Sequence, residues 1–192
     1  MATDTQAPVV AATGGSFLIE DRTPDEVFTP EDFTEEQEMI GQTAEDFIAK
    51  ELIPRLPDIL KLDYDLNREL LAKAGELGLL GVEIPEEFGG LGLDKVSGCL
   101  VAEKAGLDGS FATTFAVQVG IGTLPIVFFG TEEQKKKYLP KLASGEWVSS
   151  YSLSEASSAS DAMNAKARAV LSDDGKSWIL NGEKMWLSNA GF

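Results

Sequence analysis

The sequence predicts a mostly α-helical fold that changes to antiparallel β structure after residue 146. Two Thr-Glu-Glu-Gln capping boxes, at 34–37 and 131–134, each open a run with apolar residues spaced three and four apart. After Gly145 the apolar residues alternate instead, and the turn signals Asp173-Asp-Gly175 and Asn181-Gly182 separate short strand-like runs. With 192 residues, 43% of them hydrophobic, the chain is long enough to bury a core.

The chain divides into three predicted parts. Residues 1–33 are rich in Ala, Thr, Pro and Asp with scattered apolar residues, which predicts an arm lying on a surface. Residues 34–146 form a helical domain. Residues 147–192 begin an antiparallel β domain, which we expect to be truncated because a few strands with open edges are marginally stable.

The helical domain contains amphipathic helices and helices of uniformly apolar character. Amphipathic patterns run from Thr34 to near Pro54, over 63–79 and onward from Thr131. The residues at 94–106 and 110–129 are small and apolar almost all round, which predicts helices buried on most faces. The intervening segment "GVEIPEEFGGLGLD" holds four glycines and a proline and predicts a loop with sharp turns.

The last part of the chain predicts consecutive strands formed by "ARAVLS", "KSWIL" and "EKMWLS". Alternation suggests two strand faces, one with Trp147, Tyr151 and Leu153 and another with Ala165, Ala167 and Ala169. We expect Trp147 and Trp178 to belong to the core, because burying an indole removes a large apolar surface from water.

The charge balance restricts the partners of this chain. Its 32 acidic and 16 basic residues give a net charge of −16, which disfavours nucleic acid and anionic membranes. A nucleotide cofactor would be held by backbone amides, hydroxyls or helix N-termini. We find no apolar stretch near the roughly 18 residues that span a bilayer, and no targeting segment. A cytoplasmic protein without a membrane span is expected.

Histidine and cysteine usage excludes several chemistries. Without histidine there is no His-dependent base, catalytic triad or His–Cys zinc site, and no metal is expected. The single cysteine, Cys99, excludes an internal disulfide, and its apolar surroundings favour a buried, inert thiol. Carboxylates, hydroxyls or a bound cofactor must therefore perform any chemistry.

Four motifs, taken in order, resemble the acyl-CoA dehydrogenase family. They are "PEEFGGLG" at 85–92, "FGTEEQKKKYLPKLASGE" at 129–146, "YSLSEASSASDA" at 151–162 and "LNGEKMWLSNAG" at 180–191. The arm segment "RTPDEVFTPEDF" resembles the very-long-chain branch. The resemblance implies a helical domain, a β domain and a later helical bundle, of which this chain would hold the first and the start of the second.

The resemblance also implies an activity. Family members bind FAD and oxidise fatty acyl-CoA to trans-2-enoyl-CoA in fatty acid β-oxidation, as homo-oligomers that pass electrons to electron-transfer flavoprotein or a similar acceptor. Their catalytic glutamate lies in the C-terminal bundle, beyond residue 192 here. No acidic residue of this chain, including Glu155, is therefore assigned as the base, and the chain is expected to be inactive alone.

Site residues follow from the same motifs. Ser154 takes the position of a threonine that hydrogen-bonds the isoalloxazine, and Ser160 that of a serine touching the pyrophosphate and the pantetheine of the acyl-CoA substrate. Trp186 and Ser188 occupy positions that border the flavin and bond its N5 edge, and as strand residues two apart they would share a face. The match also places three further residues against FAD: Tyr151, Leu153 and Leu187.

One motif departs from the family pattern. The usual Glu-Pro-Gly-x-Gly-Ser-Asp reads here Glu155-Ala156-Ser157-Ser158-Ala159-Ser160-Asp161. If Ala159 had to adopt a glycine-like positive φ, about 1 kcal/mol of strain would weaken FAD binding. The alternative hypothesis is thus a non-catalytic binding or assembly module without flavin; an acyl-CoA oxidase is a third.

Small residues mark the helix expected at 110–122. They are Ser110, Ala112, Thr113, Thr114 and Ala116. In the family this helix forms a wall of the acyl-chain cavity, but small residues equally permit close helix packing, and the sequence leaves both interpretations open.

Overall fold

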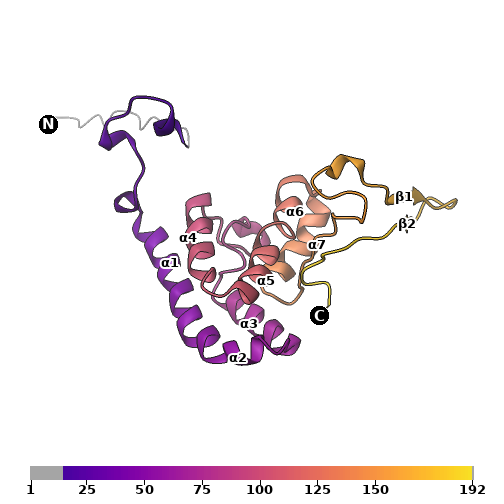
Figure 1. Cartoon of the computed structure of the whole chain (residues 1–192), viewed down its shortest axis with the longest axis horizontal. Helices are drawn as coiled ribbons and strands as arrows, with labels where there is room; N and C mark the ends of the chain where they lie inside the picture. The colour runs from indigo at the N-terminus through magenta and orange to yellow at the C-terminus, as the bar shows by residue number, and fades with distance from the viewer. Residues whose placement is uncertain (1–14, 192) are drawn as a thin grey trace.

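The computed structural model shows a helical body from which an N-terminal arm projects at one end and a β-hairpin at the other (Figure 1). It describes residues 15–191, so the first 14 residues of the predicted arm and Phe192 lie outside the described residues. The elements of the body and hairpin are α1 (Glu35–Phe47), α2 (Leu56–Ile59), α3 (Tyr64–Glu76), α4 (Lys95–Ala105), α5 (Gly109–Val119), α6 (Leu124–Phe129), α7 (Glu132–Ala143), β1 (Arg168–Leu171) and β2 (Trp178–Asn181). The predicted fold class is confirmed.

Both predicted capping boxes form. The hydroxyl of Thr34 accepts from the Gln37 amide at 3.2 Å while the Gln37 side chain accepts from the Thr34 amide at 3.0 Å. In the second box the Thr131 hydroxyl accepts from the Gln134 amide at 3.3 Å and the Gln134 side chain accepts from the Thr131 amide at 2.9 Å. Each box satisfies two backbone donors that a helix start leaves unpaired. The predicted starts of α1 and α7 are therefore confirmed.

Helix α1 ends earlier than predicted, although the helical path continues. After Phe47 the chain widens into a π-helical turn, Ile48–Leu52, and then tightens into a 3₁₀ turn, Ile53–Arg55. Pro54 has no amide hydrogen, and its ring collides with the carbonyl four residues earlier in a regular α-helix. The wider turn moves that carbonyl aside, so the chain passes through Pro54 into α2.

The main core lies between α1, α3, α4 and α5. Phe111 of α5 is fully buried and its ring lies 6.1 Å, centroid to centroid, from both Phe47 of α1 and Phe115. A smaller apolar cluster joins the loop before α4 to α7, with Ile84, Phe88, Leu139 and Ala143. Each fully buried aromatic side chain contributes on the order of 1.5–3 kcal/mol of transfer free energy, so these contacts hold the body together.

The predicted glycine-rich loop folds back on itself. The amide of Leu93 donates to the Val82 carbonyl at 2.8 Å, and that of Gly92 donates to the Ile84 carbonyl at 2.9 Å. A Cβ atom added at Gly90 would lie 2.0 Å from the Ile84 carbonyl oxygen. Only glycine permits this close approach of two backbone segments.

The prediction that α4 is buried on most faces is wrong. Its buried residues are Ser97, Val101 and Ala105, which are four apart and lie on one face. Cys99 falls on the opposite face because each residue turns the helix by about 100°. The thiol is therefore exposed rather than buried.

One segment meets the length and hydropathy expected of a membrane span. Residues Gly109–Phe129 form a 21-residue run that contains an 18-residue window with a mean hydropathy of 1.6. The structure divides them into α5 and α6, with a turn between Val119 and Leu124, and α5 packs Phe111 into the core. A core helix meets the same criterion, so this composition assigns no membrane role.

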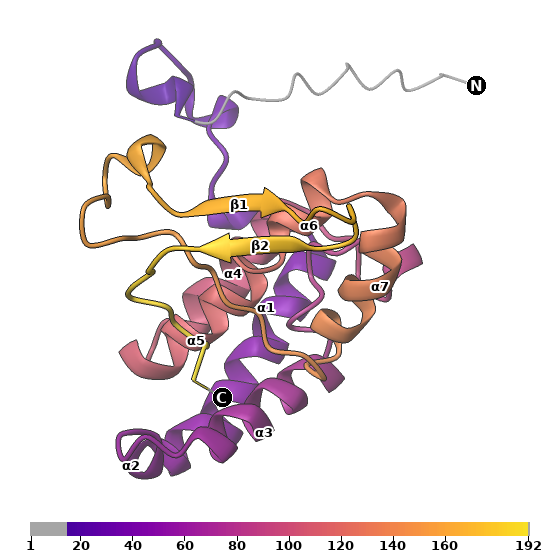
Figure 2. The same cartoon turned by 90° about the vertical axis from the view of Figure 1, so that its right-hand side faces the viewer.

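The β part forms one hairpin where three or more strands were predicted. Strands β1 and β2 pair in antiparallel register, from Arg168 opposite Asn181 to Leu171 opposite Trp178. Figure 2 shows the two strands running in opposite directions, and no further strand joins them within residues 15–191. The segments expected to supply the other strands, 147–154 and 183–188, are irregular and share one backbone hydrogen bond, from the Met185 amide to the Ser154 carbonyl.

Apolar side chains are exposed on both faces of the hairpin. Paired residues share a face, so Leu171, Trp178 and Leu180 lie on one side and Val170 and Ile179 on the other. All of these residues are exposed. The predicted core position of Trp178 is therefore wrong.

Trp147 is also outside the core. Its ring is partly exposed and lies 5.9 Å from the Tyr138 ring, with the Lys141 ammonium 4.6 Å above it. The tryptophan therefore covers the end of α7 at the protein surface.

A buried glutamine joins the helical body to the segment that leaves it. Gln118 of α5 is 1% exposed, and its amide nitrogen donates to the carbonyls of Leu142 (3.0 Å) and Trp147 (3.1 Å). Its amide oxygen accepts from the Ser149 amide at 2.7 Å. The backbone carbonyl of Gln118 also accepts from the Thr123 hydroxyl at 2.6 Å. One side chain thus fixes α5, the end of α7 and residues 147–149 relative to one another.

We predict that Gln118→Leu lowers the free energy of unfolding by about 3 kcal/mol, because the Trp147 carbonyl and the Ser149 amide lose the side-chain partner and the Leu142 carbonyl loses one of its donors. Urea unfolding of the 192-residue polypeptide at low concentration, followed by tryptophan fluorescence, measures this. Gln42→Leu, on the exposed face of α1, is the control and should change stability by less than about 0.5 kcal/mol. Equal effects of the two substitutions would contradict the assigned role.

The hairpin generates a second prediction: the 192-residue polypeptide self-associates through its exposed apolar strands. Leu180→Lys should weaken association about tenfold or more, because one leucine leaves the contact. Sedimentation equilibrium measures the constant. Met163→Lys adds the same charge at an exposed residue outside the hairpin and should leave association unchanged. A monomeric parent polypeptide at micromolar concentration is the opposing result.

Candidate functional site

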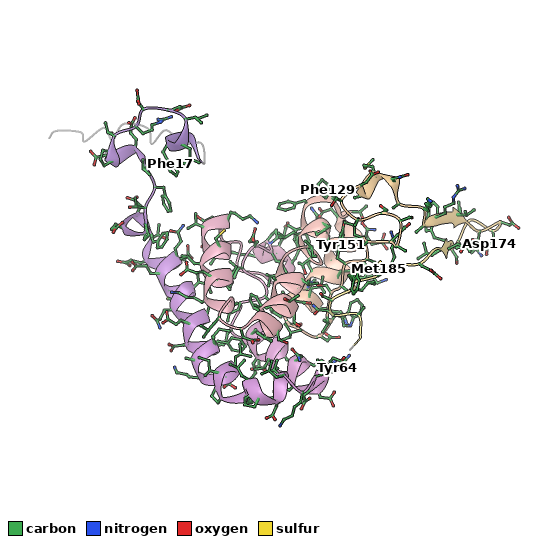
Figure 3. The ribbon with its side chains drawn as sticks, in the orientation of Figure 1. Phe17, Tyr64, Phe129, Tyr151, Asp174 and Met185 are labelled. Atoms are coloured by element: carbon green, nitrogen blue, oxygen red, sulfur yellow. The ribbon has the colours of Figure 1, made fainter. Side chains whose placement is uncertain are left out.

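Two segments that are far apart in the sequence lie side by side beyond α7. They are the leading segment, residues 150–155, and the trailing segment, residues 184–189. The Met185 amide donates to the Ser154 carbonyl at 2.9 Å. Figure 3 shows Tyr151 and Met185, one from each segment, close together between the helical body and the hairpin. The structure therefore brings together the two motifs that carry most of the predicted site residues.

The far end of the trailing segment is anchored to the body. The Ser150 hydroxyl donates to the Ser188 carbonyl at 2.7 Å. The buried Asn189 side chain donates through Nδ2 to the carbonyls of Thr114 in α5 (2.9 Å) and Ser149 (3.2 Å). Among the described residues its Oδ1 atom is buried without a hydrogen-bond partner. Asn189 thus ties the segment to the helix that Gln118 also holds.

Glu155 joins the leading segment to two other parts of the chain. Its carboxylate accepts from the amides of Lys166 (2.7 Å) and Ala167 (2.9 Å) and from the Lys184 ammonium (2.8 Å). The Lys184 ammonium, and then the two amides, lower the pKa of Glu155 from 4.5 to about 2. The stability that this charge contributes is complete above pH 4.5 and is lost as the pH falls towards 2. These contacts give Glu155 a structural role.

Trp186 has an unusual backbone. Its φ is 61°, and its side chain is 82% exposed. The expectation that Trp186 and Ser188 share the face of a strand is wrong, because this left-handed residue interrupts the alternation. A bulky residue at positive φ costs about 1–2 kcal/mol. Such strain clusters at ligand sites, where surrounding contacts enforce it.

The other predicted site residues differ in exposure. Tyr151 and Leu153 are exposed, while Ser154, Leu187 and Ser188 are half-buried. Ser160 is exposed and lies past a tight turn in which Glu155 and Ser158 exchange backbone hydrogen bonds of 2.8 and 3.1 Å. Roles in cofactor binding for these residues remain predictions.

The altered loop carries no left-handed strain at Ala159. Among the described residues the non-glycine positions with positive φ are Leu62, Trp186 and Asn189. The strain considered for Ala159 is therefore absent.

The helical part of the chain decides the family. Residues 34–146 match the family model described as "Acyl-CoA dehydrogenase, N-terminal domain". The chain belongs to the acyl-CoA dehydrogenase family. The resemblance stated from the four motifs is thereby confirmed.

Individual acyl-CoA dehydrogenases match over most of this chain. A "Probable acyl-CoA dehydrogenase" of Bacillus subtilis (strain 168) is 55% identical over 179 residues, which is 93% of this chain and 30% of that protein. A crystal structure of an acyl-CoA dehydrogenase complexed with FAD from Bacillus anthracis aligns with a TM-score of 0.90 and 54% identity, over 95% of this chain and 32% of that one. The chain thus spans about a third of the length of these relatives.

The very-long-chain branch matches at lower identity. The mitochondrial very long-chain specific acyl-CoA dehydrogenase of Homo sapiens is 45% identical over 117 residues, which is 60% of this chain and 18% of that protein. The similarity supports the branch suggested by the arm motif.

Sequence reasoning missed Gln118, Lys184 and Asn189. Asn189 carried a usable signal, since asparagine tolerates the left-handed region and its φ is 66°. The roles of Gln118 and Lys184 depend on partners 24 to 31 residues away, and no local pattern reports them.

We predict that Asn189→Asp destabilises the 192-residue polypeptide by about 2 kcal/mol at pH 7, because a carboxylate oxygen would face two carbonyls that now receive hydrogen bonds. Thermal unfolding monitored by circular dichroism measures the loss. Asn181→Asp makes the same charge change on exposed β2 and serves as the control. Equal melting temperatures for the two variants would show that the Asn189 anchor contributes nothing.

Proposed function

We propose that this chain is the N-terminal part of an FAD-dependent acyl-CoA dehydrogenase that converts fatty acyl-CoA to trans-2-enoyl-CoA. The observation that carries the proposal is the 2.9 Å hydrogen bond between Met185 and Ser154, which joins the two segments bearing the flavin motifs. The similar Bacillus anthracis protein, which is complexed with FAD, supports the same assignment.

The groups present suit a flavin dinucleotide. An exposed indole at Trp186 offers a flat apolar surface to a ring system. The hydroxyls of Ser154, Ser160 and Ser188, with nearby backbone amides, can bond polar ring edges and phosphates without positive charge. That donor set agrees with the strongly acidic composition. The chemistry that bound FAD supplies is oxidation of the Cα–Cβ bond of the thioester.

In this proposal the residues of the chain bind and orient. Ser154 and Ser188 hold the isoalloxazine edge, with Leu187, Tyr151 and Leu153 bordering it. Ser160 serves both the pyrophosphate and the pantetheine of the substrate. The base that removes the α-proton comes from a part of the whole protein outside these residues. The role in fatty acid β-oxidation, the homo-oligomer, electron-transfer flavoprotein as acceptor and a cytoplasmic location are parts of the same proposal.

We predict that Trp186→Leu weakens FAD binding by the whole protein about fivefold to tenfold, because the ring loses an aromatic contact of about 1–1.5 kcal/mol. Flavin fluorescence during dilution measures the dissociation constant. Trp178→Leu is the matched control, since it removes an exposed tryptophan from the hairpin, and it should leave FAD affinity unchanged.

Two results would count against this proposal. Equal affinities for both tryptophan variants and the parent would mean that Trp186 does not border the flavin. Purified whole protein that takes up no FAD would favour the non-catalytic module.

A further inference from the structure

Glu155 collects hydrogen bonds from two segments outside the flavin motif that contains it. Its Oε1 accepts from the Lys184 ammonium at 2.8 Å and the Ala167 amide at 2.9 Å, and its Oε2 accepts from the Lys166 amide at 2.7 Å. The side chain is only 7% exposed. Both carboxylate oxygens are thus occupied by protein donors, and three parts of the chain meet at one charge.

Lys184 extends this junction along the leading segment. Its ammonium also donates to the Leu153 carbonyl at 2.9 Å, and the next amide, that of Met185, donates to the Ser154 carbonyl. Three consecutive residues of the leading segment, 153 to 155, therefore accept hydrogen bonds from two consecutive residues of the trailing segment, Lys184 and Met185. A slip of one residue between the segments would break all of these bonds.

The Glu155 side chain is 7% exposed, whereas the Lys184 side chain is 24% exposed. Removing Lys184 alone would leave a largely buried carboxylate without its cation, which is more costly than removing both charges together. The Lys166 and Ala167 amides lie immediately before β1, so the hairpin is held by the same carboxylate. The two flavin-motif segments and the start of the hairpin are expected to move as one unit.

We propose that the Glu155–Lys184 pair is a positioning clamp for the flavin-facing groups. It sets the register of the leading segment against the trailing segment, and thereby the spacing of Ser154 and Trp186. Both side chains are engaged by protein partners, so the clamp is assigned a positioning role. The inference rests on the proposed function, because the spacing matters only if both segments face one flavin.

The test uses the whole protein with Lys184→Met, Glu155→Gln, the double variant and Lys184→Arg. Flavin fluorescence on dilution gives FAD affinity, visible circular dichroism of the bound flavin reports its surroundings, and thermal unfolding without added FAD reports the fold. Each single variant that removes a charge should weaken FAD binding about tenfold, the lower end of what lost supporting hydrogen bonds cost at metal sites. Each should also change the dichroism of the bound flavin. Lys184→Arg keeps the positive charge and should retain the FAD affinity and dichroism of the parent.

The double variant guards against misfolding, since it leaves no lone buried charge. It should melt close to the parent and still show weak FAD binding and altered dichroism. Lys50→Met, which breaks an exposed 2.7 Å pair with Asp46 on the α1 helix path, should match the parent in every measurement. Parent-like affinity and dichroism in the double variant would overturn the clamp while the proposed function stands. A parent protein that binds no FAD would overturn both.

Discussion

The carboxamide of Gln118 is the constraint on which the rest of the structure depends. Its two ends serve opposite needs: the nitrogen satisfies carbonyls where α7 ends, and the oxygen receives the amide of Ser149 where the chain leaves the body. A buried amide that uses both donor and acceptor in this way fixes direction as well as position, because no rotation keeps every bond. The leading segment therefore begins in a defined orientation, which allows the trailing segment to form its hydrogen bonds with it.

The site depends on contacts between distant residues and very little on local structure. Neither flavin-motif segment lies in a helix or strand, and what holds them is a short list of bonds to serine, lysine and asparagine side chains and carbonyls. The ammonium of Lys184 in the trailing segment pairs with Glu155. In the proposed site, the groups assigned to the ligand are hydroxyls, amides and an indole. This arrangement reconciles a dinucleotide site with a chain of net charge −16.

The parts that the sequence predicted well are those decided within one turn of chain. Thr34 and Thr131 could be recognised as caps because their partners lie three residues away. The strand expected after Asn181-Gly182 did not form: residues 182–187 are irregular, and the Met185 amide donates to the Ser154 carbonyl. To predict that Cys99 is exposed, one would have to know which face of its helix packs against the core. The motifs located the candidate site, but the clamp and the backbone of Trp186 are products of tertiary structure that no periodicity contains.

At position 186 the left-handed backbone favours glycine for stability, whereas the proposed FAD site favours the indole of tryptophan. Glycine would adopt φ near 61° without the steric cost of a bulky side chain, about 1–2 kcal/mol, and would withdraw a large apolar surface from solvent. Directed evolution for heat resistance alone would therefore drift towards glycine at residue 186 and lose the indole. Because the proposed FAD site uses the indole, sequences engineered for robustness need position 186 held fixed.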